Sequence, residues 1–318
     1  MPGRGCVASR PTAVRLANRG VSTFRLGLVG AGRMGCVHLR ALSDSDAVQV
    51  VAVAEPSATA RAALRDAGVA LHANVAALLR AGALDGVLIA APSTLHVSLV
   101  TRLATAGLLI LCEKPCGITA YQASEAAAVA ARHDVKLQVA YWRRFVPALQ
   151  RLRQRIVNGE LGALYFVACY QWDGEPPPPQ FHAGSGGILV DMAVHEFDQI
   201  RWLTGQEFSR LDGAVASVTA EPESAQVLCS LSGGSTALVS LGRRFPLGDV
   251  CRVEAFGSRD AEDFRFLWPP EGELVFLDAL RRQAEAFAAW VGGGEATGAT
   301  AADAVAALAA AEQVEIRT

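Results

Sequence analysis

Several features that define large classes of protein are missing from the sequence. There is no basic excess, because 29 lysines and arginines face 31 acidic residues for a formal net charge of −2, whereas nucleic-acid-binding domains carry a basic patch or stripe. The longest largely apolar run covers only residues 103–112 and is too short to span a membrane. The seven cysteines include no C-x-x-C pair, which argues against a disulfide framework and a structural zinc site.

The sequence does contain ample material for a hydrophobic core. Hydrophobic residues make up 51% of its 318 residues and charged residues 19%, a balance that excludes a disordered chain. At roughly 150 residues per domain, this length predicts two domains. With its scattered cysteines, the composition indicates a soluble, cytoplasmic globular protein that binds neither a membrane nor nucleic acid.

The first 23 residues differ from the rest of the chain. They contain Pro, Gly, Arg and Ser without hydrophobic periodicity, and they lack the apolar centre of a secretory signal. We expect residues 1–23 to form a disordered N-terminal extension. A transit peptide and a translation start near Val21 or Ser22 are the alternatives.

From residue 24 onward, short apolar runs alternate with helix-compatible stretches. Continuous apolar strands that alternate with helices are typical of a parallel sheet covered on both faces. The pattern therefore predicts a doubly wound Rossmann domain over residues 24–141. The predicted strands are 26–29, 49–54, 86–91, 108–112 and 136–140, and the predicted helices are 34–43, 58–67, 75–81, 95–106 and 120–133.

The second part of the chain has a run of alternating strands with short turns, which favours a mostly antiparallel open sheet. We predict an α/β domain over residues 142–295, followed by a C-terminal helical segment, 296–318, that packs back on the Rossmann domain. The predicted strands are 163–172, 214–219, 225–231, 235–241 and 250–256, and the predicted helices are 189–203, 274–291 and 300–314.

A glycine-rich turn follows the first predicted strand. Residues 30–35 read GAGRMG, the G-x-G-x-x-G spacing that brings a helix N-terminus against a dinucleotide pyrophosphate. Glu55 ends the second predicted strand, where a carboxylate binds the adenosine ribose and repels a 2′-phosphate, so NAD is favoured over NADP. Arg61 lies close enough along the chain to accommodate such a phosphate, but we prefer to place it on the exposed face of the next predicted helix. The predicted dinucleotide contacts of this turn are Gly30, Gly32, Arg33, Met34 and Gly35.

Two further motifs carry groups able to move a proton. Lys114 lies in a Glu-Lys-Pro turn at the carboxyl end of a predicted buried strand, the edge at which such sheets bind ligands. Asp191 and His195 stand four residues apart on a predicted helix, so they share one face. A carboxylate beside an imidazole is a natural acid–base pair. A core histidine is one alternative, and a metal site that includes Asp198 is another; we predict no metal, because no second His or Cys cluster accompanies these residues.

Together these motifs resemble the glucose-fructose oxidoreductase / inositol dehydrogenase / MocA family, and its inositol 2-dehydrogenase-like members in particular. The resemblance is carried by GAGRMG, by APSTLH at 91–96, by CEKP at 112–115 and by the D-x-x-x-H of 191–195. It implies a Rossmann domain followed by a mostly antiparallel α/β domain. It also implies NAD(P)-dependent oxidation of a secondary hydroxyl of a sugar or cyclitol, by a homodimer or homotetramer.

The resemblance, together with the chemistry of hydride transfer, assigns roles to the three proton-handling residues. His195 would act as general base, Asp191 would orient it, and Lys114 would hydrogen-bond the reacting oxygen; whether His195 or Lys114 is the proximal base stays open. Further expected cofactor contacts are Ser93, His96, Glu113 and Lys114.

The family also indicates which residues contact the substrate. Arg143 matches an arginine that reaches the polyol in inositol dehydrogenase-like members, although an arginine that pairs with a carboxylate between domains is an equal alternative. Gln171 and Asp173 match positions at which inositol dehydrogenases carry His and Asn, so this sequence departs from the pattern for myo-inositol. The expected substrate-binding residues are Lys114, Arg143, Gln171, Asp173, Asp191 and His195.

Three other functions fit the same motifs. A glycosidase-type enzyme could hold NAD tightly and oxidise its sugar only transiently. A dehydrogenase of secondary metabolism could act on an amino-cyclitol or another sugar. A non-catalytic NAD-binding sensor is disfavoured by the presence of Lys114, Asp191 and His195 together.

Overall fold

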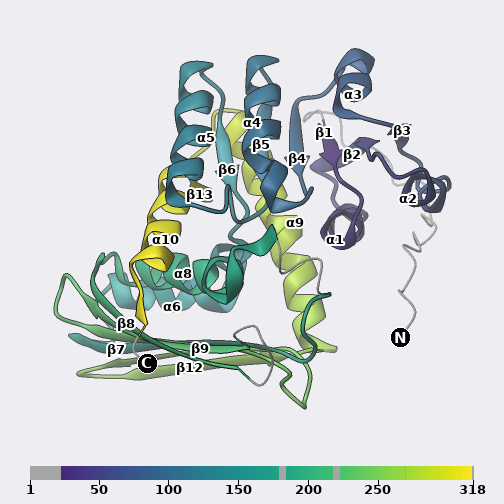
Figure 1. Cartoon of the computed structure of the whole chain (residues 1–318). Coiled ribbons are helices and arrows are strands. Elements are labelled where there is room, and N and C mark those ends of the chain that lie inside the picture. The colour runs from purple at the N-terminus through teal and green to yellow at the C-terminus, as the bar shows by residue number, and fades with distance from the viewer. Residues whose placement is uncertain (1–22, 179–183, 218–222, 269, 317–318) are drawn as a thin grey trace.

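The computed structural model describes residues 23–178, 184–217, 223–268 and 270–316. The predicted N-terminal extension, residues 1–23, lies outside the described residues except for Thr23. Two seven-stranded sheets form the molecule, and a layer of helices separates them (Figure 1). The α/β fold class, a Rossmann domain joined to a second sheet domain, is confirmed.

The first sheet has the strand order β13-β6-β5-β4-β1-β2-β3. All its strands run parallel except β13, which pairs antiparallel with β6. Because β1 pairs with β2 on one side and β4 on the other, the strand order reverses there. In sheets of this kind, ligands bind at such a reversal, beyond the carboxyl ends of the strands. The strands are β1 (Phe24–Val29), β2 (Val48–Ala54), β3 (Ala70–His72), β4 (Gly86–Ile89), β5 (Leu109–Cys112), β6 (Leu137–Val139) and β13 (Ala299–Thr300).

Helices connect these strands as the apolar pattern predicted. The predicted segments end within a few residues of the observed ones, and the largest difference is at α2, which stops at Ala63 instead of residue 67 because the chain turns at Leu64. Strand β3 was not predicted, since three residues are too few to show a period. The helices are α1 (Arg33–Leu42), α2 (Ala58–Ala63), α3 (Val75–Ala81), η1 (Ser93–Leu95), α4 (His96–Thr105) and α5 (Ala120–Arg132).

The second sheet has the order β12-β11-β7-β10-β9-β8-β14. Most neighbours are antiparallel, and the pairs β10–β7 and β14–β8 are parallel. In β9, alternate residues are buried under the helix layer, as the predicted open sheet requires. The strands are β7 (Leu164–Asp173), β8 (Phe208–Ala216), β9 (Ser224–Leu231), β10 (Thr236–Arg243), β11 (Val250–Gly257), β12 (Ala261–Leu267) and β14 (Glu315–Ile316).

Two strands of this sheet correct the prediction. β8 was predicted at 214–219, but it starts at Phe208. Arg210 and Asp212 lie on either side of the buried Leu211 and mask the apolar signal. Part of the predicted range, residues 218–219, lies outside the described residues. Strand β12 was not predicted, because its exposed positions carry charges such as Asp263, which is typical of an edge strand.

Helices of the second part of the chain lie between the sheets, and the last two, α9 and α10, extend from there along the first sheet to α1 and α5 (Figure 1). The predicted helix 189–203 begins as a π-helical turn, η3, and continues as α8, of which nearly every side chain is buried. The short η2 and α6 were not predicted. The elements are η2 (Trp142–Phe145), α6 (Pro147–Val157), η3 (Leu189–Ala193), α8 (Val194–Thr204), α9 (Glu271–Val291) and α10 (Ala301–Gln313).

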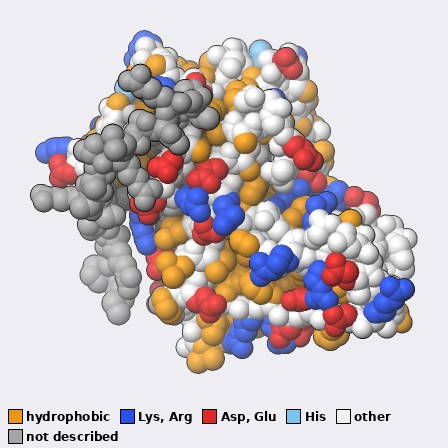
Figure 2. Space-filling view, turned by 180° about the vertical axis from the view of Figure 1, so that it is seen from behind, with side chains coloured by type: hydrophobic (Ala, Val, Ile, Leu, Met, Phe, Trp, Pro, Cys, Tyr) orange, Lys and Arg blue, Asp and Glu red, His pale blue; other side chains and the backbone are white. Residues whose placement is uncertain are grey.

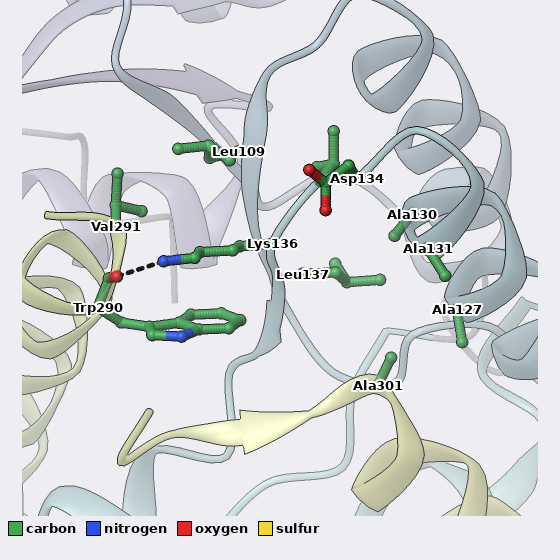
Figure 3. A pocket seen from close by; sticks show the side chains of 11 residues that line it. Leu109, Ala127, Ala130, Ala131, Asp134, Lys136, Leu137, Trp290, Val291 and Ala301 are labelled. Carbon is green, nitrogen blue, oxygen red and sulfur yellow. Dashed lines mark hydrogen bonds between the residues drawn. The ribbon is translucent and has the colours of Figure 1, made fainter. Parts of the chain in front are cut away.

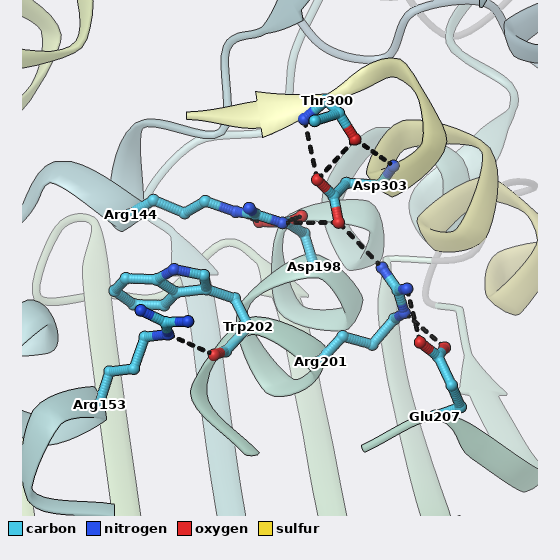
Figure 4. A network of polar contacts seen from close by, with 8 residues as sticks. All are labelled: Arg144, Arg153, Asp198, Arg201, Trp202, Glu207, Thr300 and Asp303. Atoms are coloured by element: carbon cyan, nitrogen blue, oxygen red, sulfur yellow. Dashed lines mark hydrogen bonds and ion pairs between the residues drawn. The ribbon is translucent and has the colours of Figure 1, made fainter. Parts of the chain in front are cut away.

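A network of ion pairs fixes α8 in this layer (Figure 4). Asp198 accepts two hydrogen bonds from Arg144, at 2.9 and 2.6 Å. Asp303 forms a capping box with Thr300 at the start of α10, and it also pairs with Arg144 at 3.2 Å and with Arg201 at 3.5 Å. The C-terminal helix is therefore bonded to both η2 and α8.

The domain boundaries stay a proposal. Strand β13 returns the C-terminal segment to the first sheet, which supports its assignment to the Rossmann domain. Helix α9 falls within the proposed second domain, yet its Phe287 packs edge-on against Phe24 of β1 at 5.8 Å.

Acidic and basic side chains are interspersed on the face shown in Figure 2. Among the described helices, none has the length and apolarity needed to cross a membrane.

Candidate active site

The glycine-rich loop leaves room for a ligand where the prediction requires it. Gly30 has a φ of +94°, and a Cβ at Gly35 would come within 2.1 Å of the Gly30 carbonyl oxygen, so both positions need glycine. A Cβ at Gly32 would meet no atom within 4 Å, and Gly32 caps α1 without a side-chain hydrogen bond. The first N–H groups of α1 thus face open space, which suits the pyrophosphate of a dinucleotide.

Glu55 lies against this loop at the end of β2. It is 8% exposed, and its two carboxylate oxygens accept hydrogen bonds from the backbone N–H groups of Ala31 and Ser57, each at 2.8 Å. Arg61 does not simply face solvent, because its Nη1 donates to the carbonyl oxygens of Glu55 at 2.6 Å and Pro56 at 2.8 Å. A carboxylate and a guanidinium therefore stand together where the ribose of a dinucleotide would bind.

The Glu-Lys-Pro turn places Lys114 against the second part of the chain. Its Nζ donates to the backbone oxygen of Asp191 at 2.6 Å and lies 3.3 Å from Oδ1. The other carboxylate oxygen accepts from Nη2 of Arg243 at 2.9 Å. Arg243 ends β10 and its side chain is 1% exposed. Sequence reasoning missed Arg243, because a single arginine at the end of an ordinary strand has no motif around it.

His195 is held by packing. The rings of Tyr141 and Trp142 lie edge-on to its imidazole, with centroid distances of 5.8 and 6.5 Å. Nδ1 is buried without a partner in the described part of the chain. Burial lowers the pKa of His195 well below its usual value, and the charges of Lys114 and Arg143 lower it further. The imidazole is therefore neutral near pH 7.

The expected bond between Asp191 and His195 is absent from the described contacts. Asp191 lies in the π-helical turn and His195 in the α-helix that follows. The carboxylate is occupied by Lys114 and Arg243 instead, since charge-assisted bonds to cations are stronger than a bond to a neutral ring. Asp191 thus contacts Lys114 and Arg243, and within the described residues no hydrogen bond joins its carboxylate to His195.

Three of the expected substrate residues, Arg143, Gln171 and Asp173, are joined by hydrogen bonds. Arg143 is 3% exposed, and its guanidinium bonds Glu196 on one side and Gln171 on the other. This favours the alternative in which the arginine pairs with a carboxylate. Gln171 donates in turn to Oδ1 of Asp173 at 2.9 Å. Burial raises the pKa of Asp173; the carboxylates of Asp249 and Asp191 add to that rise, and Gln171 and the Lys114 charge oppose it.

The remaining predicted residues lie around the turn. His96 is 1% exposed, and its ring nitrogens lie 2.8 Å from the carbonyl oxygens of Pro115 and Ala91. Glu113 is also buried, whereas Ser93 and Lys114 are partly exposed. Cofactor contact by these four residues stays a prediction. Asp198 is bound to Arg144 and is not available as a metal ligand. In the described ranges, no group of His, Cys, Asp or Glu could hold a metal ion.

A separate hollow lies at the opposite edge of the first sheet (Figure 3). It is lined by Leu109 and Leu137, the first residues of β5 and β6, and by Lys136, whose Nζ donates to the Trp290 carbonyl oxygen at 2.6 Å. Ligands of parallel sheets bind at the carboxyl ends of the strands. This hollow is at the amino ends and is therefore not part of the candidate active site.

Comparisons with known proteins agree with this geometry. Residues 24–141 match the oxidoreductase family with an NAD-binding Rossmann fold, and residues 149–261 match the GFO/IDH/MocA C-terminal domain. The rhizopine catabolism protein MocA of Rhizobium meliloti is 52% identical over 298 residues, 92% of this chain and 94% of the relative. Inositol 2-dehydrogenase of Rhizobium meliloti (strain 1021) is 32% identical over 267 residues, 82% of this chain and 81% of the relative.

A solved structure has the same architecture. The myo-inositol dehydrogenase of Corynebacterium glutamicum ATCC 13032 superposes with a TM-score of 0.83 at 25% identity. The superposition covers 92% of this chain and 95% of that one. The chain is thus similar over nearly its whole length to a myo-inositol dehydrogenase of known structure.

The pairing of Arg143 with Glu196 generates a stability prediction. Replacing Arg143 by Met should lower the free energy of unfolding by about 3–5 kcal/mol, because it leaves the carboxylate of Glu196 buried without its cation. The double variant, Arg143→Met with Glu196→Met, should lose much less, because no charge is stranded. Urea denaturation of both variants measures this difference. Unchanged stability in Arg143→Met, together with a raised KM for substrate, would instead make Arg143 a substrate-binding residue.

Proposed function

The chain belongs to the Gfo/Idh/MocA family of oxidoreductases, and we propose that it oxidises a secondary hydroxyl of a cyclitol or sugar to a ketone with NAD. The observation that carries this proposal is that His195 is buried and neutral and is acted on by the charge of the Lys114 ammonium. Lys114 lies beyond the carboxyl end of β5 in the first sheet and contacts Asp191. A neutral imidazole can take a proton, and an ammonium can stabilise the negative charge that develops on an oxygen.

The choice of NAD is supported by Glu55. Its carboxylate lies at the glycine loop, where it would accept hydrogen bonds from ribose hydroxyls and repel a 2′-phosphate. Arg61 is the opposing charge, and it is engaged with two carbonyl oxygens. Bound NAD would supply the acceptor for the hydride that leaves the carbinol carbon.

The protein's own residues would handle the proton and the oxygen. His195 would accept the hydroxyl proton as general base, and packing by Tyr141 and Trp142 would hold its ring in place. Lys114 would hydrogen-bond the reacting oxygen from a position that Asp191 fixes. Arg243 would hold Asp191 from the other side, so that the carboxylate does not swing toward the substrate.

The role of His195 is tested by removing its ring. His195→Ala should lower kcat by about 10²–10⁴-fold, the usual contribution of general acid–base catalysis, while NAD binding stays intact. His133→Ala is the matched control, because His133 is exposed at the end of α5 and should not affect turnover. In the wild type, the acidic limb of the kcat/KM profile should lie below pH 6.5, since burial lowers the pKa of His195. Near-normal turnover in His195→Ala would remove the histidine from the mechanism.

Cofactor preference is tested at Glu55. Glu55→Ser removes the carboxylate that would bind the ribose, so kcat/KM with NAD should fall roughly tenfold or more, the scale of one charged hydrogen bond. The value with NADP should rise, because Arg61 is then the dominant charge at the site. Initial rates with both cofactors measure the ratio. If the wild type already prefers NADP, the assignment of NAD is wrong.

An amino-cyclitol is a second candidate substrate, and Asp173 favours it. The Asp173 carboxylate lies on the inner face of β7 within the electrostatic reach of Asp191 and Asp249, and Gln171 donates the hydrogen bond to its Oδ1. A substrate that carries an ammonium group would add a second cation, beside that of Lys114, to offset the repulsion of Asp173 by Asp191 and Asp249. A neutral polyol would leave the repulsion among them in place.

The two candidates differ in their response to Asp173→Asn. For an amino-cyclitol, kcat/KM should fall roughly tenfold or more when the carboxylate becomes an amide, whereas for a neutral inositol it should change little. Asp263→Asn, on the exposed edge strand β12, serves as the matched control. An equal loss of kcat/KM with charged and neutral substrates would show that Asp173 does not bind the ammonium group.

Three lesser expectations stay with this proposal. A glycosidase-type enzyme with tightly bound NAD would use the same residues and would form no net NADH. A cytoplasmic location is supported by five buried cysteines that form no disulfide, Cys112, Cys116, Cys169, Cys229 and Cys251. A homodimer or homotetramer is supported by the outer face of the second sheet, on which Leu228 and Phe256 are 55% and 43% exposed.

A further inference from the structure

Two buried histidines that the proposed mechanism does not use hold the Glu113-Lys114-Pro115 turn. His38 lies on α1 and is 0% exposed, and its Nε2 donates to Oε1 of Glu113 at 2.6 Å. His96 begins α4, and its Nδ1 lies 2.8 Å from the Pro115 carbonyl oxygen. The residues on either side of Lys114 are thus each held by a histidine from a different helix.

The contact with His38 continues to the lysine itself. The second oxygen of Glu113, Oε2, accepts a hydrogen bond from the backbone N–H of Lys114 at 3.1 Å. The backbone N–H of Glu113 bonds the Ile89 carbonyl oxygen of β4 at 2.9 Å. Because one carboxylate bridges His38 and the Lys114 backbone, the position of α1 determines where the Lys114 side chain begins.

The same helix also carries the glycine loop. Gly32 caps α1 and Gly35 packs on the Gly30 carbonyl oxygen. His38 follows Gly32 by six residues, or about 9 Å along the helix axis at the usual rise per residue. The helix end that would bind the pyrophosphate and the contact that anchors Lys114 therefore belong to one rigid element.

We infer that His38 is a positioning residue: through Glu113 it sets Lys114 against Asp191 and aligns that lysine with the cofactor-binding end of α1. The inference rests on the proposed function for the catalytic part of Lys114. His38 touches neither Lys114 Nζ nor Asp191, so it acts only through Glu113. The contact of His96 with Pro115 remains when His38 is changed. The turn should therefore become more mobile while it stays attached to α4.

The first test compares kinetics in three variants. His38→Leu removes the bond to Glu113, and kcat should fall by up to about 100-fold, the effect of misplacing a catalytic group by about 1 Å, with little change in the dissociation constant for NAD. His38→Gln keeps an N–H donor at a similar reach and should recover most of kcat. Leu42→Ala, a buried residue of the same helix, is the control for general loosening of α1 and should lower the melting temperature without the same loss of kcat.

A second measurement does not depend on turnover. The sequence contains two lysines, Lys114 and Lys136, and Lys136 is bonded to Trp290 at the far edge of the sheet. A brief pulse of acetic anhydride followed by peptide mass spectrometry gives the acetylation of Lys114 divided by that of Lys136. Because contact with Asp191 shields the Lys114 nitrogen, this ratio should rise in His38→Leu and return toward the wild-type value in His38→Gln.

The outcomes separate the inference from the proposed function. A wild-type protein that oxidises no polyol contradicts the proposed function, while the acetylation ratio still decides the part played by His38. An unchanged ratio in His38→Leu overturns the inference, even in an active enzyme. Equal losses of kcat in His38→Leu and Leu42→Ala, or no recovery in His38→Gln, overturn it as well.

Discussion

The contact between the Lys114 ammonium and Asp191 joins the two sheets of the molecule. Lys114 follows a strand of the first sheet, Asp191 lies in the helix layer, and Arg243 ends a strand of the second sheet. Each of these charges is largely buried and would be costly without its partner. The geometry of the candidate site therefore depends on how the two sheets are placed relative to each other. The ion pairs of α8 with Arg144 and Asp303 help to fix that placement.

The distribution of charge around this contact determines what His195 can do. The ring packs among aromatic side chains, and the nearest cations that act on it are Lys114 and Arg143. Both cations and burial disfavour the protonated ring, so His195 can accept a proton near neutral pH. A lysine that interacts with the reacting oxygen and a histidine that stays neutral are complementary requirements of alcohol oxidation, and one arrangement of charges meets both.

The sequence predicted the elements that carry a strong period or a motif. The Rossmann strands, the glycine loop and the C-terminal helix that starts near Thr300 follow from short-range patterns, and the structure has them where they were expected. Strands β8 and β12 were misplaced or missed, because their outward charges hide the alternation. The sequence also could not predict which charged side chains pair when they lie far apart along the chain. Glu196 pairs with Arg143 from 53 positions away, and Arg243 meets Asp191 from 52.

The most direct measurement of the account is NADH absorbance when the purified protein is mixed with NAD and a panel of myo-inositol, scyllo-inositol, an amino-cyclitol and glucose. The account predicts a steady rise with at least one cyclitol or sugar, because a hydride acceptor, a neutral base and an ammonium would meet at one carbinol. A flat trace with every substrate, with NAD recovered from the denatured protein, would contradict net oxidation and favour an enzyme that oxidises its substrate only transiently.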